Sequence, residues 1–244
     1  MKNSLTFGII GYGRFGKLWA DCLQKLGEVK VFDKNLASKS LSDVAQSDLL
    51  FLLVPISEIE NICKKIESLL SVKTIVIDAC SVKVLPVKAM KKWLPKAQPI
   101  IATHPLFGPD SVKRMGIKNQ KIVVSKIRAT STQQKTFEKI LKKLQLKIIH
   151  ATPEQHDEQM AKSQALVHFI GRGLHSLNLN EQPIATPDYN TLLRMNEMVH
   201  NDTWQLFYDM QNYNPYTKKI RKNFLTSLQK LEYGITKKTK KRLK

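Results

Sequence analysis

The sequence lacks any apolar run long enough to cross a membrane, and it lacks a cysteine pattern that would staple a small fold. Its longest apolar run, Leu49–Val54, is far shorter than the ~20 residues of a membrane helix. The first residues, MKNSLTFGIIGYG, have no apolar core followed by a small-residue cleavage site, so they do not predict a secretory signal. The three cysteines, Cys22, Cys63 and Cys80, predict reduced thiols with no disulfide framework and no metal site. We therefore expect a cytoplasmic protein without a membrane segment.

Acidic residues are scarce: the chain has 20 Asp and Glu against 40 Lys and Arg, a formal net charge of +20. Residues 217–244 hold eleven basic residues and one acid, Glu232. The last residues, KKTKKRLK, are typical of a basic arm that binds nucleic acid or anionic surfaces, but a solvated chain end has the same composition. Aromatic residues do not alternate with the basic ones as they do in single-strand-binding proteins. Nucleic-acid contact by the tail is therefore the weaker interpretation.

The first 150 residues alternate short apolar runs with segments of helical spacing. Helices are expected at 14–26, 57–70, 84–93 and 131–145. The expected strands are Leu5–Ile10, Val29–Phe32, Leu49–Val54, Thr74–Ile77, Pro99–Ala102, Ile122–Ser125 and Leu146–His150. Nearly continuous apolar strands that alternate with helices predict a parallel sheet covered on both faces, an α/β fold of the Rossmann type.

The pattern changes to helices alone after residue 151. Thr152 can cap a helix, Pro153 suits its first position, and Gln155 completes a capping box. We expect one long helix from there to about Leu177, then a loop at 178–188 and helices at 189–211 and 217–232. The predicted organisation is a dinucleotide-binding domain (1–151), a smaller all-α domain (152–235) and a basic tail (236–244).

A GxGxxG sequence follows the first expected strand and opens the first expected helix, as a dinucleotide-binding fingerprint requires. The first glycine makes the tight turn, the second lets the backbone approach a pyrophosphate, and the third lets helix and strand pack closely. The helix N-terminus offers free N–H groups to the phosphates. The predicted cofactor-binding residues of this loop are Gly11, Tyr12, Gly13, Arg14, Phe15 and Gly16.

Asp33 lies 20 residues after Gly13, at the end of the second expected strand. A carboxylate at this place accepts hydrogen bonds from ribose hydroxyls and repels a 2′-phosphate. Asp33 therefore favours NAD over NADP. Lys34 beside it weakens the repulsion, so NADP stays a second candidate.

Several chemically distinct residues directly follow expected strands: Gly11, Asp33, Pro55, Asp78 and His104. In an open parallel sheet, ligands bind outside the carboxyl ends of the strands. Residues 78–83 and 103–105 should therefore line the same crevice as the cofactor. Pro55 and Asp78 join the predicted cofactor-binding residues, and a histidine that could be a mere turn residue becomes a candidate for catalysis.

Four motifs in order carry a resemblance: GxGxxG, D-x-x-S-V-K (78–83), T-H-P-L-F-G-P (103–109) and H-D-x-x-M-A-x-S-Q-A-L-V-H-F-I-G-R (156–172). Together they resemble the prephenate/arogenate dehydrogenase family of tyrosine biosynthesis. Residues 189–194, 201–204 and 213–214 look most similar to arogenate dehydrogenases of the plant type. The resemblance spans roughly residues 5 to 230.

This resemblance implies an NAD-dependent oxidative decarboxylation of prephenate or arogenate, giving 4-hydroxyphenylpyruvate or tyrosine. It leaves open which substrate is used, and it implies a homodimer formed by the helical domain, although residues 152–235 are few for that domain. His104 suits the role of acceptor for the substrate's hydroxyl proton, because the ordinary pKa of histidine is about 6.5. Ser81 is the candidate that orients this imidazole. Lys83 reaches the substrate or cofactor, or is simply solvated.

A second group of candidates lies on the expected long helix. At about 100° per residue, Asp157, Gln164, His168 and Arg172 fall in one polar stripe. The resemblance implies that Gln164, His168 and Arg172 bind the substrate. The alternatives are that the stripe faces solvent, or that Arg172 holds the helical domain against the sheet.

Two other functions remain as alternatives. A different Rossmann oxidoreductase, such as a β-hydroxyacid dehydrogenase, should carry a Lys-x-x-Asn pattern on a long interdomain helix, which is not found here. A nucleic-acid-binding protein built on a dinucleotide fold should bind oligonucleotides in a salt-dependent way that ends when residues 236–244 are removed.

Overall fold

The computed structural model describes residues 5–36 and 40–242, apart from the side chains of residue 200 and of residues 238–242. The chain forms two compact units, one up to His156 and one from Asp157 onward. The division falls inside helix α7 (Pro153–Lys162). The last two residues of the predicted basic tail lie outside the described range.

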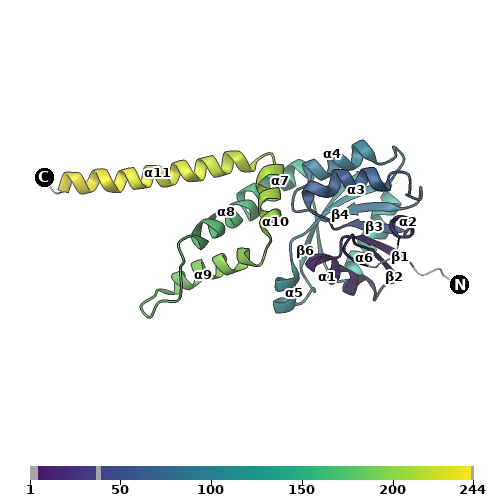
Figure 1. Ribbon diagram of the computed structural model, residues 1–244, viewed down its shortest axis with the longest axis horizontal. Coiled ribbons are helices and arrows are strands. Elements are labelled where there is room, and N and C mark those ends of the chain that lie inside the picture. Colours follow the sequence, from purple (N-terminus) through teal and green to yellow (C-terminus); the bar gives the residue numbers. More distant parts are fainter. Residues whose placement is uncertain (1–4, 37–39, 243–244) are drawn as a thin grey trace. The chain divides into compact units, whose positions relative to one another are not determined.

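The first unit is built on a seven-stranded sheet with the order β2-β1-β3-β4-β5-β6-β7 (Figure 1). Its strands are β1 (Thr6–Ile10), β2 (Glu28–Phe32), β3 (Leu49–Leu52), β4 (Ile75–Asp78), β5 (Ile100–Pro105), β6 (Lys121–Arg128) and β7 (Lys147–His150). The chain moves from β1 outward to β2 and then crosses back to β3, so the sheet reverses its winding between β1 and β3. Such a switch point is where open α/β sheets bind ligands.

The expectation of a parallel sheet holds for β1 to β5 and is wrong for the last two strands, β6 and β7, which run in the opposite direction. Strands β1 to β5 run parallel, but β6 is antiparallel to β5, and β7 is parallel to β6. A parallel crossover needs a connection that packs on the face of the sheet, usually a helix. The connection from β5 to β6 holds only α5 (Pro109–Met115), which has no buried residue. The chain instead turns back at the same edge, where Leu106 N–H donates to the Lys121 carbonyl at 2.9 Å.

Helices cover both faces of this sheet. They are α1 (Arg14–Leu23), α2 (Leu41–Ala45), the 3-10 turn η1 (Ile56–Glu58), α3 (Ile59–Ile66), α4 (Val84–Trp93), α5 and α6 (Ser131–Lys143). The helices α1, α3, α4 and α6 match the expected ones, whereas α2 and α5 were not expected. In Figure 1, α3 and α4 lie on the opposite face of the sheet from α1 and α6.

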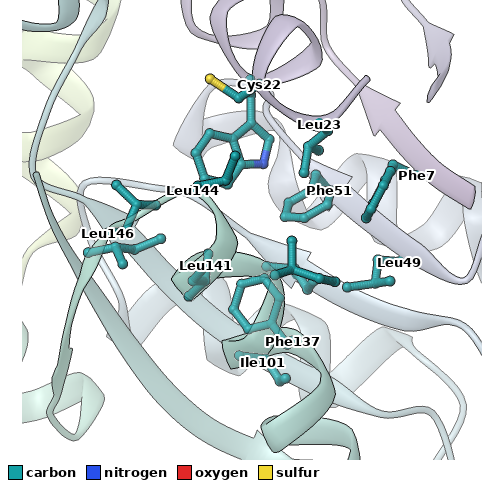
Figure 2. Packing of buried hydrophobic residues seen from close by; sticks show 14 of the residues in the cluster. Phe7, Cys22, Leu23, Leu49, Phe51, Ile101, Phe137, Leu141, Leu144 and Leu146 are labelled. Carbon is teal, nitrogen blue, oxygen red and sulfur yellow. The ribbon is translucent and has the colours of Figure 1, made fainter. Parts of the chain in front are cut away.

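The core between the sheet, α1 and α6 is aromatic (Figure 2). Trp19 of α1 meets Phe51 of β3 edge-on, with ring centroids 5.8 Å apart. Phe51 in turn lies 6.2 Å from Phe137 of α6. Because side chains alternate between faces along a strand, Phe7 and Ile9 of β1 point into this same cluster. The aromatic core fixes α1, and with it the glycine loop that precedes α1.

The second unit is all-α, with more breaks than expected. After α7 come α8 (Gln164–His175), α9 (Pro187–His200), α10 (Trp204–Tyr213) and α11 (Thr217–Arg242). The expected long helix from 152 to 177 is interrupted at Ser163, whose backbone (φ −109°, ψ −86°) is not helical. The Ser163 hydroxyl donates to the Gln159 carbonyl at 2.7 Å, a local bond that competes with the helix ladder.

Two further helix expectations need correction. The helix expected at 189–211 ends at His200, and a new helix begins where the Thr203 hydroxyl accepts a bond from Leu206 N–H at 3.1 Å. The basic tail is not a separate segment over its described part, because α11 continues through it to Arg242. No proline or glycine interrupts residues 236–242.

Within the described residues, no helix is both long and apolar enough to cross a membrane. The same residues contain no cluster of three or more His, Cys, Asp or Glu suited to a metal ion. None of the three cysteines, all of which the structure describes, forms a disulfide, and all three are buried. Burial is the main cause that raises the pKa of Cys63 to about 12, so this thiol stays protonated and unreactive at neutral pH.

Candidate active site

The glycine loop between β1 and α1 contains two kinds of glycine. Gly11 has φ +100°, and a Cβ there would come within 2.4 Å of the Leu53 carbonyl oxygen. A Cβ on Gly16 would lie 2.2 Å from the Gly11 oxygen, so both positions are required by the protein's own packing. A Cβ on Gly13 would meet no protein atom within 4 Å. The packing does not explain this glycine, whereas close approach of a dinucleotide pyrophosphate to the backbone does.

The start of α1 suits an anion. Gly13 is the N-cap residue, it offers no side-chain cap, and the first turn carries no acid, so this helix start is favourable for a phosphate. The Arg14 side chain pairs with Asp110 of α5 at 2.6 Å, with both side chains more than half exposed. Phe15 stacks on Trp19 with ring centroids 5.8 Å apart. The predicted loop residues therefore differ in what they do: Gly13 begins the helix, Arg14 forms a surface ion pair, and Phe15 packs on the core.

Asp33, just after β2, lies next to this loop. One carboxylate oxygen accepts Tyr12 N–H at 2.7 Å and the other accepts Asn35 N–H at 2.9 Å. These backbone bonds lower the pKa of Asp33, so the group is ionised at neutral pH and can accept bonds from ribose hydroxyls. Pro55 does not follow its strand directly: β3 ends at Leu52, and the exposed Pro55 precedes η1.

Asp78 and Lys83 form an ion pair in which both side chains are completely buried. The Lys83 ammonium also donates to the Thr103 carbonyl, and the Thr103 hydroxyl donates to the Asp78 carbonyl at 2.6 Å. Asp78 accepts a further bond from Cys80 N–H at 3.0 Å. This burial excludes the alternative that Lys83 is solvated, whereas contact of Lys83 or Asp78 with a ligand stays a prediction. The pair ties the end of β4 to β5.

His104 lies inside β5 and not after it, opposite Val123 of β6. Its Nδ1 is 2.8 Å from Nε2 of His156, and the two rings meet edge-on at 72°. The residues are 3% and 2% exposed. Burial is the main cause that holds the pKa of His104 well below its ordinary value of 6.5; the Lys83 ammonium, and a proton on His156 whenever one is present, also oppose a charge on His104. The imidazole is therefore neutral at pH 7.

The partner of His104 differs from the one expected. The sequence pointed to Ser81, which is half-buried in the β4–α4 connection, but Nδ1 of His104 is held by His156. The sequence alone assigned no role to His156 beyond its place in the H-D-x-x-M motif. A signal was available, because His156 opens the H-D-x-x-M motif and stands in the first turn of a helix with a clear capping box at Thr152 and Gln155.

In the second unit, three of the predicted polar residues lie along one side of α8. Gln164, His168 and Arg172 follow at four-residue spacing, and His168 and Arg172 are 8% and 9% exposed, which rules out a solvent face for these two. Asp157 lies on α7, before the break at Ser163, and does not continue this stripe.

Residues just before α10 and at its start contact the polar stripe of α8. His168 Nε2 lies 3.7 Å from the Asp202 carboxylate. The Arg172 guanidinium donates to the Asp202 carbonyl and lies 4.2 Å above the Trp204 ring, a cation–π contact. Burial lowers the pKa of His168, the Asp202 carboxylate raises it and Arg172 lowers it, for a net shift below 6.5.

Three buried polar atoms of the stripe have no hydrogen-bond partner among the described residues: Gln164 Oε1, His168 Nδ1 and Arg172 Nε. Each such atom costs about 1–3 kcal/mol when it is left unsatisfied. The α8 cluster, defined as Gln164, His168 and Arg172, thus keeps unused hydrogen-bonding capacity that a polar ligand can fill.

A glycine loop, an acid after β2 and a buried neutral histidine at the carboxyl edge of the sheet define a dinucleotide-binding dehydrogenase. Comparison with known proteins narrows this class. Residues 22–150 match the prephenate dehydrogenase nucleotide-binding domain, and residues 173–244 match the TYRAAT1-like C-terminal domain. The chain belongs to the prephenate dehydrogenase family. This match favours the expected family over a β-hydroxyacid dehydrogenase.

Two relatives are arogenate dehydrogenases 1 and 2, chloroplastic, of Arabidopsis thaliana. Each is 29% identical to the chain, over 94% and 96% of its length. The chain spans 39% of the first relative and 69% of the second. Among solved structures, prephenate dehydrogenase from A. aeolicus in complex with hydroxyphenyl propionate and NAD+ superposes with a TM-score of 0.75. It is 18% identical, and the match covers 97% of this chain and 92% of that one. At this identity the likeness establishes the fold.

Proposed function

We propose that the protein is an NAD-dependent dehydrogenase that oxidatively decarboxylates arogenate or prephenate in tyrosine biosynthesis. The observation that carries the proposal is His104, a buried and neutral imidazole at the strand edge that also bears the glycine loop and Asp33. Bound NAD+ supplies the hydride acceptor. The hydride leaves the ring carbon that bears the hydroxyl, the ring carboxylate departs as CO2, and the ring becomes aromatic.

In this proposal His104 takes the hydroxyl proton at Nε2. Within the described residues this nitrogen makes no hydrogen bond, whereas Nδ1 is engaged by His156. A positioned general base contributes typically about 10²–10⁴-fold to the rate. Aromatisation drives the remaining step, so the other residues chiefly hold the substrate in place.

The α8 cluster is proposed to bind the substrate's carboxylates. Both substrates carry two carboxylates, and Arg172 and His168 offer a buried guanidinium and an unpartnered ring nitrogen. Gln164 is proposed to bind the same ligand through its amide. The family match over residues 22–150 and the match of residues 173–244 support the assignment of the two units to one enzyme.

Asp202 favours arogenate over prephenate. Its carboxylate lies beside His168, and the side chain is 35% exposed. Arogenate carries an ammonium group where prephenate carries a keto oxygen, so a nearby carboxylate attracts the first and repels the second. The names of both Arabidopsis relatives agree with this preference.

The specificity is tested with Asp202→Asn. We expect kcat/KM for arogenate to fall, so that the ratio of kcat/KM for arogenate to kcat/KM for prephenate becomes smaller. The reason is that the amide in the Asp202→Asn variant keeps the shape of the carboxylate and loses its charge. Asp188→Asn, an exposed site in the first turn of α9, is the control and should leave the ratio unchanged. An unchanged ratio in Asp202→Asn would refute the role of this carboxylate.

The cofactor is proposed to be NAD in preference to NADP, because the ionised Asp33 repels a 2′-phosphate. Rates measured with NAD+ and NADP+ side by side test this preference. Equal kcat/KM values for the two would contradict it.

We also propose a homodimer. Phe224, Leu228, Leu231 and Ile235 of α11 repeat at intervals of four, three and four residues, the spacing of a helix seam. Leu228, Leu231 and Ile235 are 46%, 65% and 64% exposed. Light scattering should give twice the chain mass, and Leu228→Lys with Leu231→Lys should give a monomer. A monomeric wild type contradicts the proposal.

The enzyme is proposed to work in a reducing compartment such as the cytoplasm, which agrees with three described cysteines that form no disulfide. The Arabidopsis relatives are named chloroplastic. Fluorescent tagging of the full chain in its own cells tests the compartment, and a signal confined to an oxidising compartment counts against it.

The activity itself is tested by initial rates of NADH formation with arogenate and prephenate. Wild type should turn over at least one substrate, and His104→Asn should lose about 10²–10⁴-fold in kcat. His150→Asn is the control, since His150 is an exposed histidine on β7. Turnover that survives in His104→Asn refutes the catalytic role, and no turnover by wild type refutes the function.

A further inference from the structure

His156 shares a hydrogen bond with the proposed base. We propose that His156 is a positioning residue that fixes the tautomer of His104, so that the Nε2 lone pair of His104 points toward the substrate. This inference rests on the proposed function, because it explains how His104 is made ready to accept a proton. The observation that carries it is the 2.8 Å contact between His104 Nδ1 and His156 Nε2.

The argument is a count of protons. A neutral imidazole has one N–H donor and one lone pair, and the short contact between the two nitrogens holds a single proton. If His156 donates, His104 carries its own hydrogen on Nε2 and can only donate there. If His104 donates from Nδ1, its Nε2 keeps the lone pair. Only the second arrangement lets His104 accept the hydroxyl proton.

The surroundings keep both rings in place. His104 is fixed by the pairing of β5 with β6. His156 is set by the first turn of α7, where its N–H donates to the Thr152 carbonyl at 2.9 Å. The reciprocal bonds between Thr152 and Gln155, at 3.0 and 3.2 Å, fix the start of that turn. With both residues almost fully buried, water does not compete for the shared proton.

The same bond assists the proton transfer. When His104 takes the hydroxyl proton at Nε2, it becomes an imidazolium that still donates from Nδ1 to the neutral His156. A hydrogen bond with one ionised partner is roughly twice as strong as a neutral one. The pair therefore gains strength as the reaction proceeds, which is the condition for lowering the barrier.

The tautomer can be measured without any turnover. In protein labelled with ¹⁵N-histidine at pH 8, two-bond ¹⁵N–¹H correlations distinguish the two neutral forms, and His104→Asn identifies the His104 signals. We expect the Nδ1–H form in wild type and a shift toward the Nε2–H form, the commoner one in water, in His156→Leu. An Nε2–H form in wild type overturns the inference.

Kinetics test the consequence. His156→Leu should lower kcat ten-fold or more with KM little changed. His156→Gln should restore most of kcat, because the amide oxygen can accept the Nδ1 proton. His150→Gln is the matched control on an exposed histidine. Unchanged kcat in His156→Leu, or a Gln variant no better than Leu, counts against the positioning role.

The two measurements separate the two claims. If wild type turns over neither substrate, the proposed function fails, while the NMR result still decides whether His156 sets the tautomer. If His156→Leu does not fold, the tautomer of wild type and the kinetics of His156→Gln remain decisive: an Nε2–H form, or a Gln variant that has lost activity, overturns the inference.

Discussion

The two polar clusters of the molecule are built on opposite principles. Around His104, the protein itself supplies partners for the polar side chains: His156 contacts the His104 imidazole, and Lys83 forms an ion pair with Asp78. In the α8 cluster, one buried polar atom on each of Gln164, His168 and Arg172 lacks a partner among the described residues. The first cluster is organised before any ligand arrives, apart from Asp78 Oδ1. The second keeps hydrogen-bonding capacity that a polar ligand can fill, which agrees with the proposal that it binds the substrate.

The largest expected effect comes from breaking the first cluster. Lys83→Met should lower the free energy of unfolding by about 3–5 kcal/mol, because it leaves the Asp78 carboxylate buried without its counter-charge. Denaturant titration measures this loss. Lys83→Met combined with Asp78→Asn should recover much of it, since the double variant buries no charge.

A surface pair provides the control for this experiment. Lys64 lies 3.3 Å from Glu60 on α3, with both side chains about half exposed. Lys64→Met should change the free energy of unfolding by less than about 1 kcal/mol. If Lys83→Met changes the free energy of unfolding as little as Lys64→Met does, the buried ion pair is not what organises the cluster around His104.

A smaller effect is expected in the second cluster. Arg172→Ala should raise KM about ten-fold, equivalent to about 1.4 kcal/mol of binding, and lower kcat less. Arg172→Lys should not restore binding, because an ammonium lacks the planar fork and the stacking of the guanidinium.

Stability measurements distinguish this result from unfolding. The loss of the Trp204 contact should cost about 0.5–2 kcal/mol, and Arg194→Ala, an exposed site on α9, serves as the control. If Arg172→Ala lowers the free energy of unfolding and leaves KM unchanged, Arg172 stabilises the fold and does not bind the substrate.

The smallest effect is a pH dependence shared by both clusters. Burial lowers the pKa of His104 and of His168 below 6.5 in the folded protein. Below pH 6.5 the unfolded chain takes up protons that the folded one refuses, so the free energy of unfolding falls as pH drops. The loss is at most about 1.4 kcal/mol per pH unit for each group.

Two variants sharpen this prediction. His104→Asn should flatten the slope between pH 7 and 5.5 more than His168→Asn, because the Asp202 carboxylate partly offsets the shift of His168. Unfolding by denaturant across this range measures both slopes. An equal or larger effect in His168→Asn would contradict the comparison.

Much of the first unit follows from the sequence. Apolar runs that stop at Gly11, Asp33 and Asp78 predict parallel strands, and the position of those stops predicts the ligand-binding edge. The direction of β6 does not follow, because an apolar strand reads the same in either direction. We attribute this direction to the connection between β5 and β6, because its helix α5 has no fully buried residue and does not cover the sheet as a crossover helix does. The break at Ser163 is equally hidden, since it is a departure of one residue's backbone from helical angles, and the sequence around it keeps helical spacing.

Of the candidate site, too, one part could be predicted from the sequence and another part could not. His104 could be found from its place at a strand end and from the resemblance at residues 103–109. The sequence marks His156 by its motif, but it does not pair His156 with His104, because the two residues lie 52 positions apart in the chain and only the fold brings them together. The burial of Lys83 was also out of reach, since a lysine in a loop is usually solvated and this one is held by contacts from two strands.

The reversal of the chain at β6 has a consequence for engineering. It leaves residues 108–116 as one segment between β5 and β6, bounded at its base by the bond between Leu106 and Lys121 and linked to the glycine loop by the exposed Asp110–Arg14 pair. Because α5 has no fully buried residue and packs on the core through the partly buried Val112, we expect that this segment can be exchanged as a cassette between relatives, provided that an apolar residue is kept at position 112.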